Sequence, residues 1–185
     1  MIVVGSTTFY FAPADPVQAE ILAFAAAEQT ELCVGAYALT LAPLVADLLA
    51  NHARGLTQQV LCDLSQEQGH YEHPAVVQLI NAGVDVVIGT APSGNILHSK
   101  YLLGKSQQAV FSGSYNFSAS AAIQDNCSQL FADQLVWQAY RSHFDVARAW
   151  VVANEPQDQI KGAIAAGVRL ETLRFSVPVR FEPEQ

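Results

Sequence analysis

The chain has 185 residues, of which 51% are hydrophobic and 14% are charged. This length and composition predict one globular domain with a sizeable core and exclude an intrinsically disordered chain. The formal net charge of −8 argues against extensive contact with the backbone of duplex DNA, which requires many Lys and Arg side chains.

The apolar segments and the first residues of the chain predict where the protein is located. No apolar run reaches the ~20 residues that cross a bilayer, so we expect no stable membrane insertion. Residues 1–14 lack the basic start and apolar block of a signal peptide, which predicts a cytoplasmic protein. Cys33, Cys62 and Cys127 match no zinc spacing and are expected to be small buried side chains.

Helical and strand-like patterns alternate along the first 135 residues. In chain order, helices are predicted over 15–29, 44–54, 74–81, 117–123 and 134–153, and strands over 32–39, 59–64, 84–88, 97–103, 108–112 and 128–132. Strands that alternate with helices of this length indicate βαβ units. The expected fold class is therefore α/β, with a mixed, mainly parallel sheet and helices on both faces.

The end of the chain is predicted to extend this domain. Residues 1–154 are expected to form the catalytic domain, and residues 155–185 a C-terminal extension packed on it. Alternating residues over 172–177 predict a strand, and Pro178 favours an edge position for it.

The segment around His98 carries the strongest chemical signal. In a strand, His98 and Lys100 project to the same face, where two cationic groups side by side favour a shared anion. The following strand ends at residues 112–114, just before a predicted helix whose first N–H groups could bind that anion. Asn116 adds an amide donor, so the set fits a phosphate.

These residues resemble the motif of the phospholipase D superfamily. The motif is His-x-Lys followed by Gly-Ser and Asn, which here are His98, Lys100 and residues 113–116. The chain is most similar to the short branch with one motif copy, which includes bacterial endonucleases. Similarity in order and spacing, for example at residues 34–37, covers about the first 150 residues and implies a phospholipase D-like sandwich.

The resemblance implies a role for each motif residue. His98 would be the nucleophile that forms a phosphohistidine intermediate. Lys100 and Asn116 would complete the catalytic set by binding the non-bridging phosphate oxygens. Ser114 and Gly113 would contact the substrate. The family uses no metal and no cofactor, and none is expected here.

Two positions depart from the family pattern. Lys105 stands where the motif usually has an aspartate of largely structural role, and Ser128 stands where an acidic residue normally orients the histidine. Asp125 lies close enough in sequence to substitute for that acid. A weakened enzyme, or a protein that only binds, is therefore a real alternative.

A single motif copy also predicts a homodimer. Two-step phosphoryl transfer needs a second group to protonate the leaving oxygen, and a twofold dimer would place two His98 side chains around one phosphate. Within the chain, His52, His70, His73 and His143 are rivals for this role, and the loop residues His70 and His73 are favoured because loops often carry function. His52 and His143 lie on predicted helices and are expected to be structural or surface residues.

Other aromatic and basic residues could contact a nucleic acid. Tyr37, Tyr101 and Tyr115 could stack on bases, although core positions are expected for them. Arg141 and Arg148 lie on one face of a predicted helix, where a solvated face is expected.

Three hypotheses follow. The first is a metal-independent phosphodiesterase, a nuclease acting on DNA or RNA at a dimer interface. The second is a phospholipase or phosphatidyl transferase, which tolerates the acidic composition better. The third is a catalytically weakened nucleic-acid-binding or assembly module.

Overall fold

A computed structural model describes residues 1–67 and 72–168 of the chain. Its eight strands form one sheet in the order β1-β2-β8-β7-β6-β3-β4-β5. The strands are β1 Ile2–Val4, β2 Thr7–Ala12, β3 Glu31–Ala36, β4 Thr57–Asp63, β5 Asp85–Gly89, β6 Tyr101–Gly104, β7 Ala109–Gly113 and β8 Asn126–Phe131. The helices are α1 Val17–Ala27, α2 Ala42–Ala53, α3 Leu64–Glu67, α4 His73–Asn81, α5 Gln134–Asn154 and α6 Gln157–Ala165, with 3₁₀ turns over Pro92–Gly94 and Ser120–Ile123.

The predicted α/β class, with a mixed sheet between helices, is confirmed, but the sheet is not mainly parallel. Only the pairs β3–β4 and β4–β5 are parallel, and the other five neighbouring pairs are antiparallel. The difference arises because β1 and β2 form an unpredicted hairpin that adds to β8. Consecutive hairpins at β6, β7 and β8 extend the antiparallel part.

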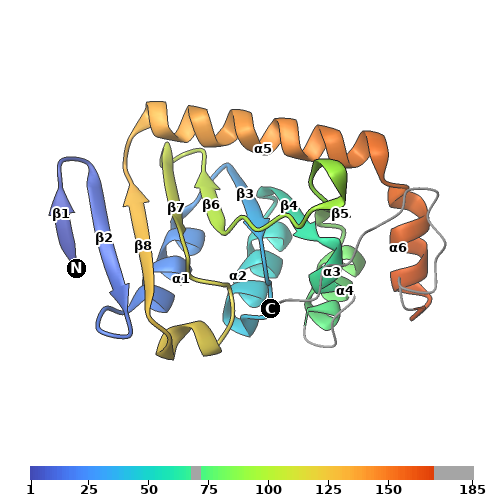
Figure 1. Cartoon of the computed structure of the whole chain (residues 1–185), viewed down its shortest axis with the longest axis horizontal. Coiled ribbons are helices and arrows are strands. Elements are labelled where there is room, and N and C mark those ends of the chain that lie inside the picture. The colour runs from blue at the N-terminus through green and yellow to red at the C-terminus, as the bar shows by residue number, and fades with distance from the viewer. Residues whose placement is uncertain (68–71, 169–185) are drawn as a thin grey trace.

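Helices cover both faces of the sheet, as Figure 1 shows. On one face, α5 runs across the strands from β8 toward α6 and buries Phe144 and Val151 against Leu61 and Val87. On the other face, α1, α2, α4 and α6 contribute to the larger core cluster. Within the described residues, no helix combines the length and apolar character needed to cross a bilayer.

Local sequence explains where the βαβ helices begin and end. Pro43 lies in the first turn of α2, where its missing N–H leaves no helical bond unmade. Gly55 and Gly83 follow α2 and α4 with φ of 86° and 88°, a left-handed conformation that favours glycine after a helix. The chain can therefore turn directly into β4 and β5.

Two predicted elements differ near the motif. β6 begins at Tyr101, whose partner Gly35 is the last paired residue of β3 on that side, so residues 97–100 precede the strand. The helix expected over 117–123 is only a four-residue 3₁₀ turn, Ser120–Ile123. The predicted strand over 172–177 lies outside the described residues.

Candidate active site

The candidate site lies where the chain leaves β3 and approaches β6. His98 is exposed, and its ring centroid lies 4.4 Å from that of Tyr37 at an interplanar angle of 63°. The Nζ atom of Lys100 lies 4.8 Å from the same tyrosine ring centroid. Tyr37, only 6% exposed, therefore contacts both motif residues and holds them together although neither belongs to a strand. The buried position expected for Tyr37 is confirmed.

Lys100 is a buried cation. It is 7% exposed, and its Nζ donates a hydrogen bond to the backbone carbonyl of His98 at 3.0 Å. Among the described residues, no carboxylate lies within ion-pair distance of it. Burial lowers the pKa of Lys100 to about 8, because an ammonium group loses hydration in this position. A bound anion would restore the favourable interaction that water no longer supplies.

Asn116 is brought to the same region by backbone hydrogen bonds. The N–H groups of Thr40 and Leu41 donate to the carbonyl of Phe117 at 2.8 and 2.7 Å. The residue before Phe117 therefore lies beside the loop that carries Tyr37. The Oδ1 atom of Asn116 is buried and has no hydrogen-bond partner in the described part of the chain. Because Oδ1 is an acceptor, a phosphate oxygen would have to bind the Nδ2 donor of this amide.

Gly113 and Ser114 contact β8 rather than a helix start. A Cβ atom on Gly113 would lie 2.3 Å from the carbonyl oxygen of Cys127 and 2.6 Å from the Cα of Ser128, so close strand pairing requires glycine. The Oγ of Ser114 donates to Asn126 Oδ1 and accepts from the Cys127 N–H, both at 3.0 Å. An α-helix was predicted to start here and to bind an anion through its first N–H groups, and that prediction is wrong. A substrate contact by either residue stays a prediction.

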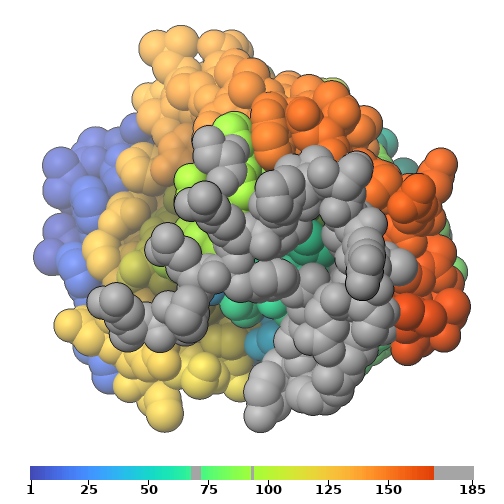
Figure 2. Space-filling model, turned by 45° about the vertical axis from the view of Figure 1, so that its right-hand side comes forward, coloured from blue at the N-terminus to red at the C-terminus, as the bar shows by residue number. Residues whose placement is uncertain are grey.

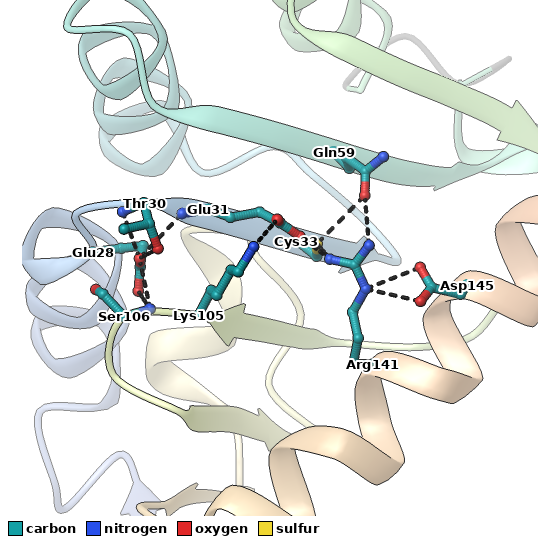
Figure 3. Close-up of polar contacts among 9 residues, drawn as sticks. All are labelled: Glu28, Thr30, Glu31, Cys33, Gln59, Lys105, Ser106, Arg141 and Asp145. Atoms are coloured by element: carbon teal, nitrogen blue, oxygen red, sulfur yellow. Dashed lines mark hydrogen bonds and ion pairs between the residues drawn. The ribbon is translucent and has the colours of Figure 1, made fainter.

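The two departures from the family motif have different consequences. Lys105 forms an ion pair with Glu31 at 3.2 Å, and the next residue, Ser106, donates its N–H to the buried Glu28 carboxylate at 3.0 Å (Figure 3). The β6–β7 turn is thus hydrogen-bonded to the carboxylate of Glu28, the residue that follows α1. Ser128, in contrast, is 1% exposed, and its Oγ has no hydrogen-bond partner among the described residues. Asp125 is exposed in the preceding loop. Ser128 gives the site no carboxylate.

One other histidine shares a cavity with His98. His143 on α5 and His98 both line a cavity of about 350 Å³ between α5 and the segment before β6. In Figure 2 that segment, coloured green, lies against α5. His73 instead pairs with Glu67, Nδ1 to Oε1, at 2.6 Å. His70 lies outside the described residues. His143 was expected to be a structural or surface residue, and it lies at this cavity instead.

The basic residues of α5 serve the fold. Arg141 pairs with Glu31 of β3 and with Asp145, and Arg148 pairs with Asp85 of β5 at 2.5 Å (Figure 3 shows the Arg141 contacts). The prediction of a solvated helix face is therefore wrong for both arginines. Within residues 1–67 and 72–168, no group of three or more His, Cys, Asp or Glu side chains is placed to hold a metal ion.

The mixed sheet between α5 and the opposite helix layer defines the fold of a phospholipase D-like domain. Residues 21–150 match the family described as cardiolipin synthase, PLD-like domain. The chain therefore belongs to this family of phospholipase D-like domains. No curated protein matches the sequence.

Solved structures with the same fold were also found. Nuc from Salmonella typhimurium, a phospholipase D family member, has a TM-score of 0.70 at 19% identity over 77% of this chain and 93% of its own. NucT from Helicobacter pylori has a TM-score of 0.68 at 13% identity over 76% and 94%. TrmBL2, an archaeal DNA-binding chromatin protein, has a TM-score of 0.56 at 11% identity over 78% and 52%. At these identities the likeness establishes the fold alone.

Proposed function

We propose that this protein is a metal-independent phosphodiesterase whose nucleophile is His98. The observation that carries the proposal is the arrangement of an exposed imidazole beside a buried ammonium group that no described carboxylate neutralises. In the proposed reaction the His98 ring attacks phosphorus and forms a phosphohistidine, which water then hydrolyses. Lys100 and Asn116 bind the non-bridging oxygens.

The energetics of Lys100 favour an anionic ligand. Removing an ammonium group from water is costly, and a hydrogen bond to a carbonyl and a tyrosine face offset only part of that cost. A phosphodiester anion would offset more of it and would raise the lysine pKa again. Charge on the equatorial oxygens grows toward the transition state, so a fixed cation at this position favours the transition state over the ground state.

A nuclease is the narrower form of the proposal, and the charge distribution limits how such a substrate would bind. Arg54 donates to the backbone carbonyls of Ala26 and Glu28, while Lys105, Arg141 and Arg148 pair with carboxylates. Among the described basic residues, only Lys161 has neither kind of partner, and Lys100 donates to the backbone carbonyl of His98 alone. A DNA or RNA substrate would therefore contact few phosphates, and its binding would depend only weakly on salt.

The decisive experiment replaces the nucleophile. His98→Asn is expected to lower the turnover of bis(p-nitrophenyl) phosphate in EDTA by at least about 10³-fold, while the matched variant His52→Asn keeps the wild-type rate. Quenching the wild-type reaction at alkaline pH should trap a phosphoryl group that is stable to base and released by acid. Unchanged turnover in His98→Asn would refute the proposal. Comparing single-stranded DNA, RNA and phospholipid vesicles then separates the nuclease from a phospholipase or phosphatidyl transferase.

A non-catalytic anion-binding or assembly module is the second candidate. Ser128 favours it, since a hydroxyl without a partner in the described part of the chain stands where the family has an orienting acid. This candidate predicts that the wild type and His98→Asn bind a phosphodiester equally and that neither turns it over. A covalent phosphohistidine in the wild type would exclude it.

A further inference from the structure

A buried carboxylate holds the chain directly before the proposed nucleophile. Asp63 is the last residue of β4 and is fully buried, and its Oδ2 atom accepts a hydrogen bond from the N–H of Leu97 at 2.6 Å. We propose that Asp63 is a positioning residue for His98, which it holds in place through the Leu97 N–H. The proposal rests on the proposed function, because it concerns the nucleophile of the same reaction.

The sheet order explains why the segment that carries His98 depends on such a contact. The chain leaves β5 at Gly89 and enters β6 at Tyr101, so residues 90–100 cross the carboxyl-terminal ends of β4 and β3 (Figure 1). His98 precedes β6 and belongs to no strand. Sheet pairing therefore does not fix its position, whereas Asp63 lies at the end of a strand that the segment crosses and binds the segment there.

The two oxygen atoms of Asp63 have different partners. Oδ1 accepts hydrogen bonds from the N–H groups of Ser65 and Gln66 at 2.9 and 3.3 Å and from the Ser65 hydroxyl, all at the start of α3. Oδ2 binds Leu97. In the described part of the chain no cation pairs with Asp63, so these donors satisfy the buried carboxylate. Because the partners are divided between two atoms, the contact with α3 and the contact with Leu97 can be changed separately.

Hydrogen bonds to charged groups hold the backbone on both sides of His98. The Leu97 N–H donates to Asp63, and the His98 carbonyl accepts from Nζ of Lys100 at 3.0 Å. Hydrogen bonds to ionised groups are stronger than those between neutral groups. An ammonium group has three N–H donors, so Lys100 can keep this bond while it binds a phosphate. Ser128 stands where the family has an acid that orients the imidazole ring, and Asp63 supplies a carboxylate that fixes the backbone instead.

Attack on phosphorus is sensitive to the position of this backbone. The reacting atoms must approach within about 3 to 3.5 Å with aligned orbitals, and a displacement of about 1 Å can lower the rate about 10²-fold. Lys100 is held separately, because its carbonyl accepts from the Gly113 N–H of β7 at 3.3 Å. Loss of the bond from Leu97 to Asp63 is therefore expected to slow attack by His98 and to leave the affinity for phosphate nearly unchanged.

Two variants separate the roles of the two oxygen atoms. In Asp63→Asn the amide oxygen is expected to face the N–H groups at the start of α3, which sets the NH₂ group against the Leu97 N–H. With bis(p-nitrophenyl) phosphate in EDTA, kcat should fall by about 30- to 100-fold, while the inhibition constant of inorganic phosphate changes less than about threefold. Ser65→Ala removes only a donor to Oδ1 and is the matched control, which should keep kcat within about twofold.

Amide hydrogen exchange gives a second readout that does not depend on activity. The Leu97 N–H should exchange faster in Asp63→Asn than in the wild type, because its acceptor is lost. In Ser65→Ala its exchange should match the wild type.

Three outcomes would overturn the proposal: unchanged kcat in Asp63→Asn, an equal loss of kcat in Ser65→Ala, or a parallel loss of phosphate binding. The last two would mean that the carboxylate only caps α3 or supports the fold. If Asp63→Asn does not fold, replacement of Leu97 by its α-hydroxy acid analogue removes the N–H alone. The same loss of kcat there supports the proposal, and a wild-type kcat refutes it. Full turnover in His98→Asn would instead refute the proposed function, so the two failures are distinguishable.

Discussion

The two ends of β3 differ in whether their charged side chains are paired with opposite charges. At its amino-terminal end, Glu31 pairs with both Lys105 and Arg141, and Arg141 also binds Asp145 at 2.9 Å (Figure 3). Glu28, just before the strand, is fully buried and accepts hydrogen bonds from the N–H groups of Thr30 and Ser106. Burial by itself would raise the pKa of Glu28, but these hydrogen bonds outweigh it and the pKa is lowered.

At the carboxyl-terminal end the polar groups are left unmatched. Lys100 is buried without a described carboxylate, and Asn116 Oδ1 and Ser128 Oγ lack partners in the described residues. Unsatisfied buried groups destabilise a fold. Buried polar atoms without a described partner, such as Gln58 Oε1 and Arg148 Nε, also lie at the other end. The contrast between the two ends therefore rests on the buried Lys100 charge, which has no described carboxylate, against the paired charges around Glu31.

The sharpest test of this contrast is Lys100→Met. Loss of the cation is expected to lower kcat/KM for a phosphodiester by about 10²- to 10³-fold, as for one lost transition-state contact. The same variant should be more stable at pH 7, by on the order of 1 to 3 kcal/mol, because a buried charge with a lowered pKa is removed. Activity assays and urea denaturation measure the two effects. A less stable variant would mean that Lys100 contributes to the fold.

At the amino-terminal end of β3, a substitution is expected to lower stability and to leave activity unchanged. Glu28→Gln puts an amide NH₂ group where a carboxylate accepts bonds from Thr30 and Ser106, so a donor meets a donor. We expect a loss of about 2 to 3 kcal/mol in the free energy of unfolding, with the turnover of the folded protein unchanged. Glu20→Gln, in α1 and partly exposed, is the control and should cost much less. A comparable loss in the control would show that α1 is sensitive to any change of charge.

The pH dependence follows from Lys100. Its ammonium form holds the phosphate, so kcat/KM should fall as pH rises through about 8, approaching a tenfold loss per pH unit. Stability has the opposite sign: between about 8 and the unfolded value of about 10.4 the unfolded chain binds more protons, so stability rises with pH. Lys100→Arg should keep activity flat across this range. A wild-type profile without this descending limb would contradict the assignment of Lys100 as the binding cation.

Local patterns in the sequence predicted much of the fold. The helix α5 and the turn around Gly104 and Lys105 were confirmed, because a 3.6-residue period and a glycine turn are local signals. The β1–β2 hairpin was missed because Ile2–Val4 is exposed along its whole length, so it has no alternating pattern. That omission made the sheet look mainly parallel.

The motif residues could be identified from the sequence, but the residues that lie around them in the fold could not. His98 and Lys100 were named from their spacing, whereas their common neighbour Tyr37 lies about sixty residues earlier and was assigned to the core. His143 was ranked below the loop histidines, because its place at the cavity depends on how α5 crosses the sheet. Sequence spacing carries no information on such a crossing. No local pattern distinguishes a helix residue that faces a cavity from one that faces solvent.

Lys105→Asp tests whether Glu28 has taken over from the family aspartate. The substitution removes the ion pair with Glu31 and adds a carboxylate beside two existing ones, so we expect a loss of about 1 kcal/mol in stability. Lys105→Gln removes only the exposed ion pair and should cost less than about 0.5 kcal/mol. Because the added term is a repulsion between partly exposed charges, the difference between the two variants should shrink in 1 M salt. If Lys105→Asp proved more stable than Lys105→Gln, the β6–β7 turn would still accept the family carboxylate. The buried Glu28 would then be an additional carboxylate near the turn and not a replacement for the family aspartate.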